Sequence, residues 1–324
     1  MVYIILLNWN GWKDTIHCLE SIFRSEYKDF RVIVCDNLSS DGSMEKIESW
    51  AKGELIFDEK INESLEHLVL PPVPKPLPYY RYSKEEAEKE GNTDNNDHRL
   101  ILIDNGSNNG FSAGNNVGVR FALQRKADFI WLLNNDTVIK NNTLGELVQH
   151  METDRKTGAA GSVIYFASNP DEMQTFGGGR VSSFLGVDRF SHTKDAVNYI
   201  AGTSLFVRAG VFEQAGLLDE GFFFYWEDVD FSRRVENCGW KLDVVENAVV
   251  YHKFSASVGG GSLKSDLFKT ASLTRYFKKH FKRNWFFPVF FNIGGMVINR
   301  FLRFQFSRIV PIIKELSRSM KQGE

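Results

Sequence analysis

Cysteine is scarce in this 324-residue sequence, and its scarcity excludes one class of protein. The chain has three cysteines, an odd number, and two of them fall in apolar periodic segments typical of a protein core. Small secreted domains held by a disulfide framework carry cysteines in even numbers at regular spacings. The sequence therefore predicts a protein of a reducing compartment.

Long apolar runs are also rare. The first, residues 2–7, is too short for the apolar region of a signal peptide and lacks a basic flank, so it predicts a first β-strand. Residues 286–304 are apolar at helical spacing, but Gly294-Gly295, Arg300 and Arg303 interrupt them. This segment is a poor spanning helix. It fits two alternatives equally well, an interfacial helix or one of a helical pair packed on the domain.

Net charge is almost absent, at −2, and the apolar content of 43% is that of an ordinary soluble globular protein. The small sum conceals an asymmetry. Residues 264–320 hold twelve lysines and arginines against Asp266 and Glu315, so this tail carries +10 and the remainder is acidic. Such a split predicts a membrane surface or another anionic partner for the tail.

What the sequence does contain is a repeated order of apolar run, polar turn and helical spacing. The runs are residues 2–7, 32–35, 100–103 and 129–133. Because they are continuous rather than alternating, they predict strands covered on both faces, and hence a parallel sheet. After residue 161 the pattern changes to short strands and glycine-rich turns, which predicts a mixed sheet edge.

Residues 54–98 break this rhythm. They carry eleven acidic against five basic residues, and five of the chain's eight prolines lie between Pro71 and Pro78. This composition predicts a partly extended insertion on the surface, for which we expect no catalytic role.

Two aspartates directly follow predicted buried strands, where open α/β sheets bind ligands. Asp36 is placed to accept a hydrogen bond from the N–H of a nucleotide base, whereas helix capping, the alternative, suits Asp41 or Ser43 better. Asp136 supplies one hard oxygen ligand for a divalent ion that already carries phosphate oxygens and waters. Convergence of His252 on it would favour Mn²⁺ over Mg²⁺. A histidine that ends a strand is, however, usually structural.

A third acidic point is the run Tyr225-Trp226-Glu227-Asp228-Val229-Asp230, which lies where a turn meets a helix. Acids at a helix start also satisfy the helix dipole, which explains one or two of the three. It does not explain the aromatic wall of residues 222–226. Such a wall would desolvate a carboxylate and raise its basicity toward a hydroxyl proton.

The loop at residues 108–116 is rich in asparagine and glycine and joins the third strand to a helix. Small residues allow close backbone approach, and the amides of the following helix favour an anion. The loop matches neither the dinucleotide-binding fingerprint nor a P-loop, so a flexible turn is the alternative.

Taken in order, these segments resemble the family 2 glycosyltransferases of the GT-A fold, in particular their bacterial and archaeal rhamnosyltransferase-like branch. The resemblance covers residues 1–52 and 99–253. The matching motifs are Leu7-Asn8-Trp9-Asn10-Gly11, Asp36-Asn37 through Asp41-Gly42-Ser43, Asn109-Gly110-Phe111 through Asn115, Leu133-Asn134-Asn135-Asp136, Gly202-Thr203, Glu227-Asp228-Val229-Asp230 and Tyr251-His252.

The resemblance implies an α/β fold of the GT-A type, with a Rossmann-like, mostly parallel sheet flanked by helices, a mixed acceptor-side region and a C-terminal helical tail. It implies a glycosyltransferase domain over residues 1–256, with a nucleotide-binding half to residue 160 and an acceptor-side half from residue 161. A basic, amphipathic helical region would follow over residues 257–324.

The resemblance also implies roles for single residues in an inverting transfer. Asp228, with Glu227 beside it, would be the general base, and a divalent metal (Mg or Mn) held by Asp136 and His252 would neutralise the leaving nucleoside diphosphate. The expected nucleotide-sugar-binding residues are Asn8, Asn10, Asp36, Asn109, Gly110, Asn115 and Asn135. The residues expected to orient acceptor or phosphate are Gly202, Thr203, Trp226, Asp230 and Arg234.

The sequence departs from the family pattern in three places. The metal motif, commonly Asp-x-Asp, begins with Asn134, so Asp136 is its only carboxylate. The acidic insertion is unusual for the family. The chain also lacks the Gln-x-x-Arg-Trp element of processive synthases, which predicts the addition of one sugar or a few.

Two other functions compete with this one. A sugar-phosphate nucleotidyltransferase would carry a basic, glycine-rich loop after the first strand, where this chain has only Lys13. A non-catalytic nucleotide-sugar-binding module would need no base. For the transferase we expect a dTDP- or UDP-linked sugar donor, a glycan or lipid-linked acceptor and no nucleic acid partner. We expect a cytoplasmic location, peripheral on the inner face of the cell membrane through residues 264–320.

Overall fold

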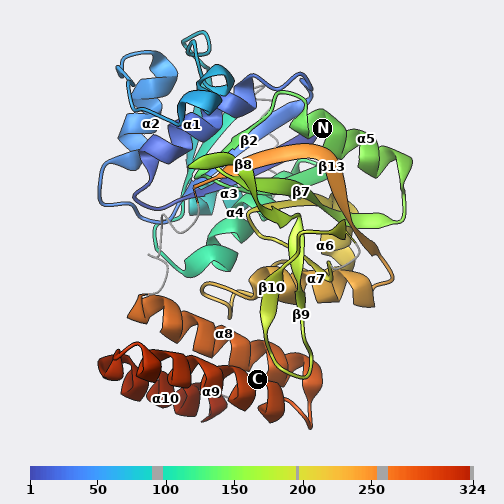
Figure 1. Cartoon of the computed structure of the whole chain (residues 1–324). Coiled ribbons are helices and arrows are strands. Elements are labelled where there is room, and N and C mark those ends of the chain that lie inside the picture. The colour runs from blue at the N-terminus through green and yellow to red at the C-terminus, as the bar shows by residue number, and fades with distance from the viewer. Residues whose placement is uncertain (90–97, 195–196, 254–261, 322–324) are drawn as a thin grey trace.

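A single large β-sheet lies at the centre of the part of the molecule that precedes the C-terminal helices (Figure 1). The structure is a computed structural model and describes residues 1–89, 98–194, 197–253 and 262–321. The strands are β1 (Val2–Asn8), β2 (Phe30–Asp36), β3 (Tyr79–Ser83), β4 (Leu100–Asp104), β5 (Phe129–Asn134), β6 (Thr137–Ile139), β7 (Thr157–Phe166), β8 (Asn169–Phe176), β9 (Gly178–Val181), β10 (Asp188–Phe190), β11 (Tyr199–Ile200), β12 (Ser204–Arg208) and β13 (Lys241–His252).

Helices cover both faces of this sheet and form a separate layer at the C-terminus (Figure 1). The helices are α1 (Trp12–Phe23), α2 (Ser43–Lys52), η1 (Glu63–Leu68, a 3₁₀ turn), α3 (Lys84–Glu88), α4 (Gly110–Gln124), α5 (Thr143–Thr153), α6 (Ala209–Ala215), α7 (Glu227–Asn237), α8 (Leu263–Phe281), α9 (Phe286–Leu302) and α10 (Phe306–Lys321).

The sheet runs in the order β3-β4-β2-β1-β5-β12-β7-β13-β6, with β8 paired to β7. Strands β1 to β5 are joined by parallel pairs, as the continuous apolar runs predict. Beyond β5 the sheet is mixed, because β12 is antiparallel to both β5 and β7 while β13 is parallel to β7. The predicted fold class, a mostly parallel sheet flanked by helices with a mixed acceptor-side region, is confirmed.

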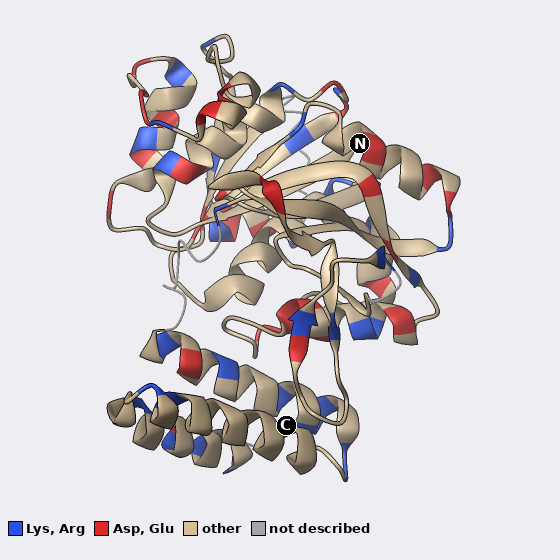
Figure 2. Ribbon diagram, viewed as in Figure 1, with Lys and Arg blue, Asp and Glu red and all other residues tan. Residues whose placement is uncertain are grey.

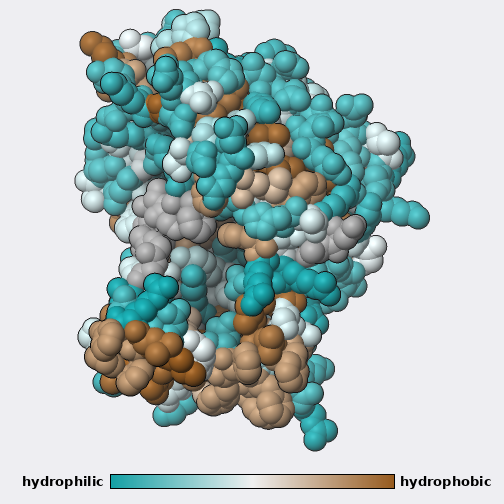
Figure 3. Space-filling model, in the orientation of Figure 1, coloured by the Kyte–Doolittle hydropathy of each residue, from teal (hydrophilic) through white to brown (hydrophobic). Residues whose placement is uncertain are grey.

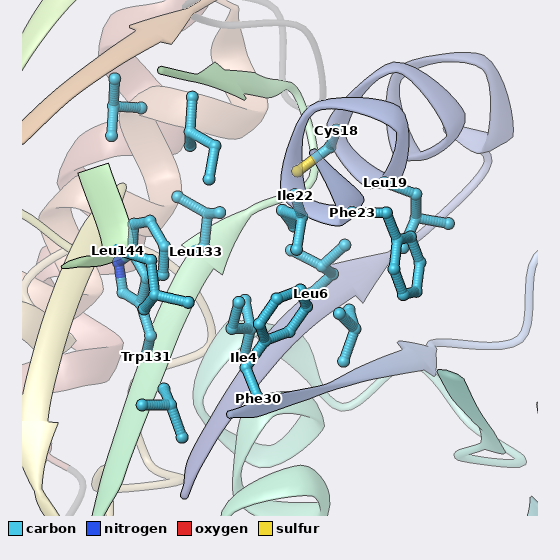
Figure 4. Close-up of a cluster of buried hydrophobic side chains, with 14 of the residues drawn as sticks. Ile4, Leu6, Cys18, Leu19, Ile22, Phe23, Phe30, Trp131, Leu133 and Leu144 are labelled. Carbon is cyan, nitrogen blue, oxygen red and sulfur yellow. The ribbon is translucent and has the colours of Figure 1, made fainter. Parts of the chain in front are cut away.

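Alternate residues of the central strands feed two cores. Ile4 and Leu6 of β1 pack beneath α1, α2 and α5, together with Ile22 and Leu144 (Figure 4). Ile5, one residue along the strand, faces the opposite core under α4, α6 and α7. Because both faces are covered, every residue of these strands must be apolar, which explains the uninterrupted runs in the sequence.

The second half differs from the expectation in one element. The sequence suggests two short strands before Tyr251-His252, but β13 is one strand of twelve residues with a shift of register between Val245 and Val249. The polar residues Glu246 and Asn247 lie in that shift, where they interrupt the apolar pattern without ending the strand.

The insertion is more structured than its composition suggests. Residues 79–83 form the edge strand β3, parallel to β4, and α3 follows with a capping box between Ser83 and Glu86. The insertion is thus partly extended, as expected, and its extended part joins the sheet as an edge strand. A five-residue edge strand beside a proline cluster gives too weak a pattern to detect. Residues 90–97 of the insertion lie outside the described residues.

The C-terminal region is a bundle of three helices, drawn in orange and red below the sheet in Figure 1. The periodicity of the sequence predicts a basic helix over residues 263–281, and α8 has these bounds. Helix α9 forms despite Gly294-Gly295. Helix α8 packs through Leu273, Tyr276 and Phe277 on Phe222 and Trp226, which lie just before α7. It also packs on α9 and α10. No helix in the described ranges is long and apolar enough to cross a bilayer. The expected domain boundary at residue 256 lies outside the described residues.

Candidate active site

The parallel strands end together, and their polar last residues meet at one edge of the sheet. Asn8, at the end of β1, is in register with Asp36 of β2, and Leu7 with Asn134 of β5. The side chain of Asn8 donates from Nδ2 to Asp36 Oδ1 at 2.6 Å. The strand ends that the sequence singles out therefore form one continuous floor.

Asp36 is buried in this floor and carries three hydrogen bonds. Besides the bond from Asn8, its carboxylate accepts from the backbone N–H of Ser39 at 2.8 Å and from Ser39 Oγ at 2.6 Å. Asn10 is exposed and accepts from the N–H of Ser40 at 2.7 Å, which fixes the same turn. Asp36 thus holds the turn after β2. Asp41 Oδ1 accepts hydrogen bonds from the N–H and the Oγ of Ser43, the first residue of α2, as expected for a residue that caps the start of this helix.

Above this floor lies a cavity of about 690 Å³, with the open space at its mouth included. Its lining combines amide side chains with aromatic rings and one lysine. The lining residues are Leu7, Trp9, Asn37, Asn108, Gly110, Phe111, Asn134, Asn135, Asp136, Phe223, Phe224, Lys264 and Phe268.

Asp136 lines this cavity and contacts His252, which does not line it, although 116 residues separate the two in the chain. His252 Nε2 lies 3.2 Å from Asp136 Oδ1, and both side chains are largely buried. The other ring nitrogen of His252, Nδ1, lies 3.0 Å from Gln174 Oε1, a contact that orients the ring. Burial raises the pKa of Asp136, but His252 outweighs it and the pKa is lowered overall, so the carboxylate is charged at neutral pH.

These residues fit a divalent metal only as a pair. Within the described parts of the chain, no group of three or more His, Cys, Asp or Glu side chains is arranged to hold an ion. Asp136 lines the cavity, and His252 contacts Asp136 without lining the cavity. An ion held by these two ligands must take its remaining ligands from substrate oxygens and water. The donor set of one carboxylate and one imidazole is compatible with Mn²⁺.

The acidic run forms the first turn of α7. Asp228 Oδ2 accepts from the N–H of Gly202 at 2.9 Å, and Oδ1 accepts from the N–H of Val229 at 2.8 Å. Burial raises the pKa of Asp228 to about 6 despite these two donors. Burial and the charge of Asp228 also raise the pKa of Glu227 well above its usual range. Oε2 of Glu227 is buried and has no hydrogen-bond partner in the described structure.

Short backbone links connect this acidic run to the cavity. Gly202 binds Asp228, and the carbonyl of the next residue, Thr203, accepts from the N–H of Asn134 at 3.0 Å. On the other side, the N–H of Phe111 donates to the carbonyl of Phe223 at 2.7 Å. The strand end that carries Asp136 and the loop that leads to Asp228 are therefore joined by hydrogen bonds.

Gly110 is where the loop at residues 108–116 requires glycine. Its φ is +92°, and a Cβ at this position would lie 2.3 Å from the carbonyl oxygen of Phe223. Asn115 is buried and donates to the carbonyl of Phe111 at 2.9 Å, and Asn109 is exposed and donates to Ser107. Among these three expected nucleotide-binding residues, only Gly110 lines the cavity.

Three of the expected acceptor-orienting side chains point away from the cavity. Trp226 is buried against Tyr276 and Phe277 of α8. Asp230 is fully buried and pairs with Arg234 at 2.8 Å, and also with Lys279 and His280 of α8. Burial raises the pKa of Asp230, but the hydrogen bond from His280 and the charges of Arg234 and Lys279 lower it to about 2 overall. Trp226 and Asp230 thus hold α7 and its loop on α8, whereas Arg234 links Asp230 to the carbonyls of Ala215 and Gly216 at the end of α6.

Several lining residues were missed by the sequence analysis. Trp9 and Asn37 stand inside recognised motifs but were given no role, and a base or sugar ring needs such flat and amide-bearing neighbours. Lys264 and Phe268 were assigned to the basic tail. Only the fold brings the first turn of α8 over the cavity, so no local signal marks them.

Comparison with protein families decides the classification. A family model described as glycosyl transferase family 2 matches residues 3–62, and a second, glycosyl transferase family group 2, matches residues 129–286. The chain belongs to the family 2 glycosyltransferases. The first match covers the floor around Asn8 and Asp36, and the second covers Asp136, Asp228 and His252.

Curated relatives in this family match over parts of their length. A low-salt glycan biosynthesis hexosyltransferase of Haloferax volcanii is 29% identical over 42% of this chain and 46% of its own length. An N-acetylglucosaminyl-diphospho-decaprenol L-rhamnosyltransferase of Mycobacterium tuberculosis is 36% identical over 22% of this chain and 24% of its own. The matched segment thus spans about half of the first relative and a quarter of the second. The resemblance to rhamnosyltransferases is confirmed.

Solved structures confirm the fold. A mannosyltransferase of Pyrobaculum calidifontis, solved with GDP-Man and Mn²⁺, superposes with a TM-score of 0.54 at 14% identity and covers 100% of this chain and 76% of its own. The S. aureus protein TarS gives a TM-score of 0.54 at 11% identity over 99% of this chain and 81% of its own. At such identities the likeness supports the GT-A architecture and nothing finer.

Proposed function

We propose that this family 2 glycosyltransferase moves a hexosyl group from a nucleoside-diphosphate sugar to a hydroxyl of a glycan or lipid-linked acceptor. The transfer is a single displacement with inversion, and it adds one sugar or a few. One observation carries the proposal. The carboxylate of Asp228 accepts a hydrogen bond from the N–H of Gly202. The carbonyl of the adjacent Thr203 accepts one from Asn134, at the strand end that leads to Asp136.

In the proposed reaction Asp228 is the general base. Its carboxylate takes the proton of the acceptor hydroxyl while the hydroxyl oxygen forms a bond to the anomeric carbon. The bond from that carbon to the diphosphate breaks on the opposite face, which inverts the configuration. With its pKa at about 6, Asp228 is ionised at neutral pH and more basic than an ordinary aspartate. Glu227 would face the acceptor with its unpartnered oxygen.

The cavity is proposed to hold the donor. Trp9 and Phe268 offer flat apolar surfaces for a base or sugar, and Asn37, Asn108 and Asn135 offer amide groups. The solved relatives support a nucleotide-linked donor, since one was solved with GDP-Man and another, TarS, with UDP. We propose a dTDP- or UDP-linked donor.

Asp136 and His252 are the proposed metal ligands, for Mn²⁺ or Mg²⁺. A bound divalent ion would neutralise charge on the leaving diphosphate. Lys264, which reaches the cavity from α8, adds a fixed positive charge on the same side. The structure with Mn²⁺ among the solved relatives supports this assignment.

A lipid-linked acceptor is supported by the name of the Mycobacterium tuberculosis relative, which identifies a diphospho-decaprenol substrate for that protein. Together with the basic C-terminal helices, it leads us to propose a cytoplasmic enzyme that is peripheral on the inner face of the membrane.

The substitution Asp228→Asn tests the proposed base. An amide keeps the shape of the side chain but does not take a proton, so we expect turnover to fall by at least 10²-fold. Binding of the nucleotide sugar, measured by calorimetry, should remain within about threefold of wild type. The matched control is Asp171→Asn on the exposed surface of β8, which should leave both quantities unchanged. A wild-type rate of nucleoside-diphosphate release in Asp228→Asn would refute the role.

A further inference from the structure

Apolar side chains are exposed on the C-terminal helices far more than elsewhere. Of the twenty large apolar side chains exposed in the described structure, twelve lie in residues 286–320. Figure 3 shows this apolar surface gathered at the end of the molecule formed by these helices. We call this surface the aromatic face and define it by Phe287, Phe291, Phe301, Phe304, Phe306 and Val310.

The aromatic face is one side of helices that are otherwise well packed. We call residues 216–226, which precede the proposed base, the catalytic loop. Both helices bury apolar side chains against α8 and this loop, namely Val289 and Ile293 of α9 and Ile312 and Leu316 of α10. Arg300 of α9 makes two hydrogen bonds to buried Asp266 of α8, at 2.7 and 2.9 Å. The helices are thus fixed in orientation, and their exposed apolar rows are a consequence of the amphipathic sequence.

The charge around the aromatic face has one sign. The sequence contains no aspartate or glutamate between Asp266 and Glu315, a stretch with ten lysines and arginines. Figure 2 shows basic residues along the same three helices. Arg303 and Lys314 are exposed on or beside the apolar rows. An apolar surface bordered by cations matches the interfacial region of a bilayer that contains anionic lipids.

We infer that the aromatic face inserts into the headgroup and upper acyl region of an anionic membrane, with α9 and α10 lying along its surface. A second copy of this chain is a poorer occupant, because two such faces would bring the exposed cations Arg303 and Lys314 of each copy together. Insertion is interfacial, because no described helix has the length and apolarity to span.

This orientation bears on the acceptor and so rests on the proposed function. Helix α8 carries Lys264 and Phe268 into the cavity and packs on α9 and α10 with other residues. The cavity then lies about one helix diameter, roughly 10 Å, above the membrane-facing helices. An acceptor hydroxyl at that height is supplied by a lipid that carries its sugar on a diphosphate, and less readily by a soluble glycan.

Vesicle binding of the full-length chain, without donor or acceptor, tests the inference. The protein should sediment with vesicles of phosphatidylcholine that contain 30% phosphatidylglycerol. Its partitioning into vesicles of pure phosphatidylcholine should be weaker by roughly fivefold or more, because the attraction of several cations to anionic lipid is missing. The triple variant Phe291→Ser/Phe301→Ser/Phe304→Ser should lose at least tenfold in partitioning, roughly as expected for three apolar side chains. Because these side chains are exposed, its thermal unfolding should match wild type.

Two further measurements separate the outcomes. Replacing Arg303 and Lys314 by glutamine should reduce binding to anionic vesicles and leave the weak binding to neutral vesicles unchanged. Sedimentation equilibrium without lipid should show a monomer. A wild-type chain that ignores both vesicles, or a dimer that the triple phenylalanine variant dissociates, would overturn the inference. Donor hydrolysis in detergent reports on the proposed function independently, since it needs no membrane.

Discussion

Asp228 and Asp230 stand two residues apart on α7, and their surroundings give them opposite properties. Asp228 is half-buried beside Glu227, and burial raises its pKa to about 6. Asp230 is enclosed by Arg234, Lys279 and His280, and its pKa is lowered to about 2. One side of the helix therefore carries the proposed base, and the other side anchors the helix.

The raised pKa of Asp228 predicts the pH dependence of the reaction. A general base works in its ionised form, so kcat/KM should rise with pH up to about pH 6 and level off above it. The fall on the acid side should be close to tenfold per pH unit. Initial rates between pH 4.5 and 8, with circular dichroism as a check on folding, measure the profile. A rate independent of pH from 5 to 7 would contradict the assignment.

The lowered pKa of Asp230 predicts a loss of stability on substitution. Asp230→Asn removes a buried charge that faces Arg234, Lys279 and His280, and we expect the free energy of unfolding to fall by about 2–3 kcal/mol at pH 7. Because the folded pKa lies below the ordinary value, this stabilisation is present above about pH 4 and is lost as the pH falls toward 2. Urea titrations of wild type and variant at pH 7 and pH 3 measure the difference. An unchanged midpoint at pH 7 would argue for an acceptor-facing role instead.

At the scale of elements, the contact between α4 and the catalytic loop depends on glycine. In Gly110→Ala the new Cβ would collide with the carbonyl of Phe223, and the φ of +92° would add strain. We expect a loss of about 2–4 kcal/mol in unfolding free energy and weaker donor binding. Gly210→Ala is the matched control, since its Cβ meets no atom within 4 Å and the residue lies in α6. Equal stability of the two variants would rule out the proposed constraint.

Elements were predictable where local pattern and fold agree. The strands β1, β2, β4 and β5 and the bounds of α8 follow from apolar continuity and periodicity alone. The edge strand β3 was hidden, because its residues alternate with polar ones in a segment of acidic composition. Strand β13 was divided in two, because a bulge resembles a turn in sequence.

The site was predictable to the level of its strand ends. Asp136 and His252 were expected to converge, and the structure places them in contact. Trp226, Asp230 and Arg234 were assigned by motif, but the structure directs the first two to α8 and Arg234 to the end of α6, since sequence order does not reveal which side of a helix faces which neighbour. The same limit hid Lys264 and Phe268, which reach the cavity from a distant helix.

At the scale of the whole molecule, the C-terminal helices and the catalytic loop share one apolar cluster. Phe222 and Trp226 of the loop pack with Tyr276 and Phe277 of α8 and with buried residues of α9 and α10. A chimera that replaced these helices with a foreign anchor would strip the loop of its packing partners just before Asp228. Exchange of the C-terminal helices between members of this family therefore requires the loop and the helices to be transplanted as a unit.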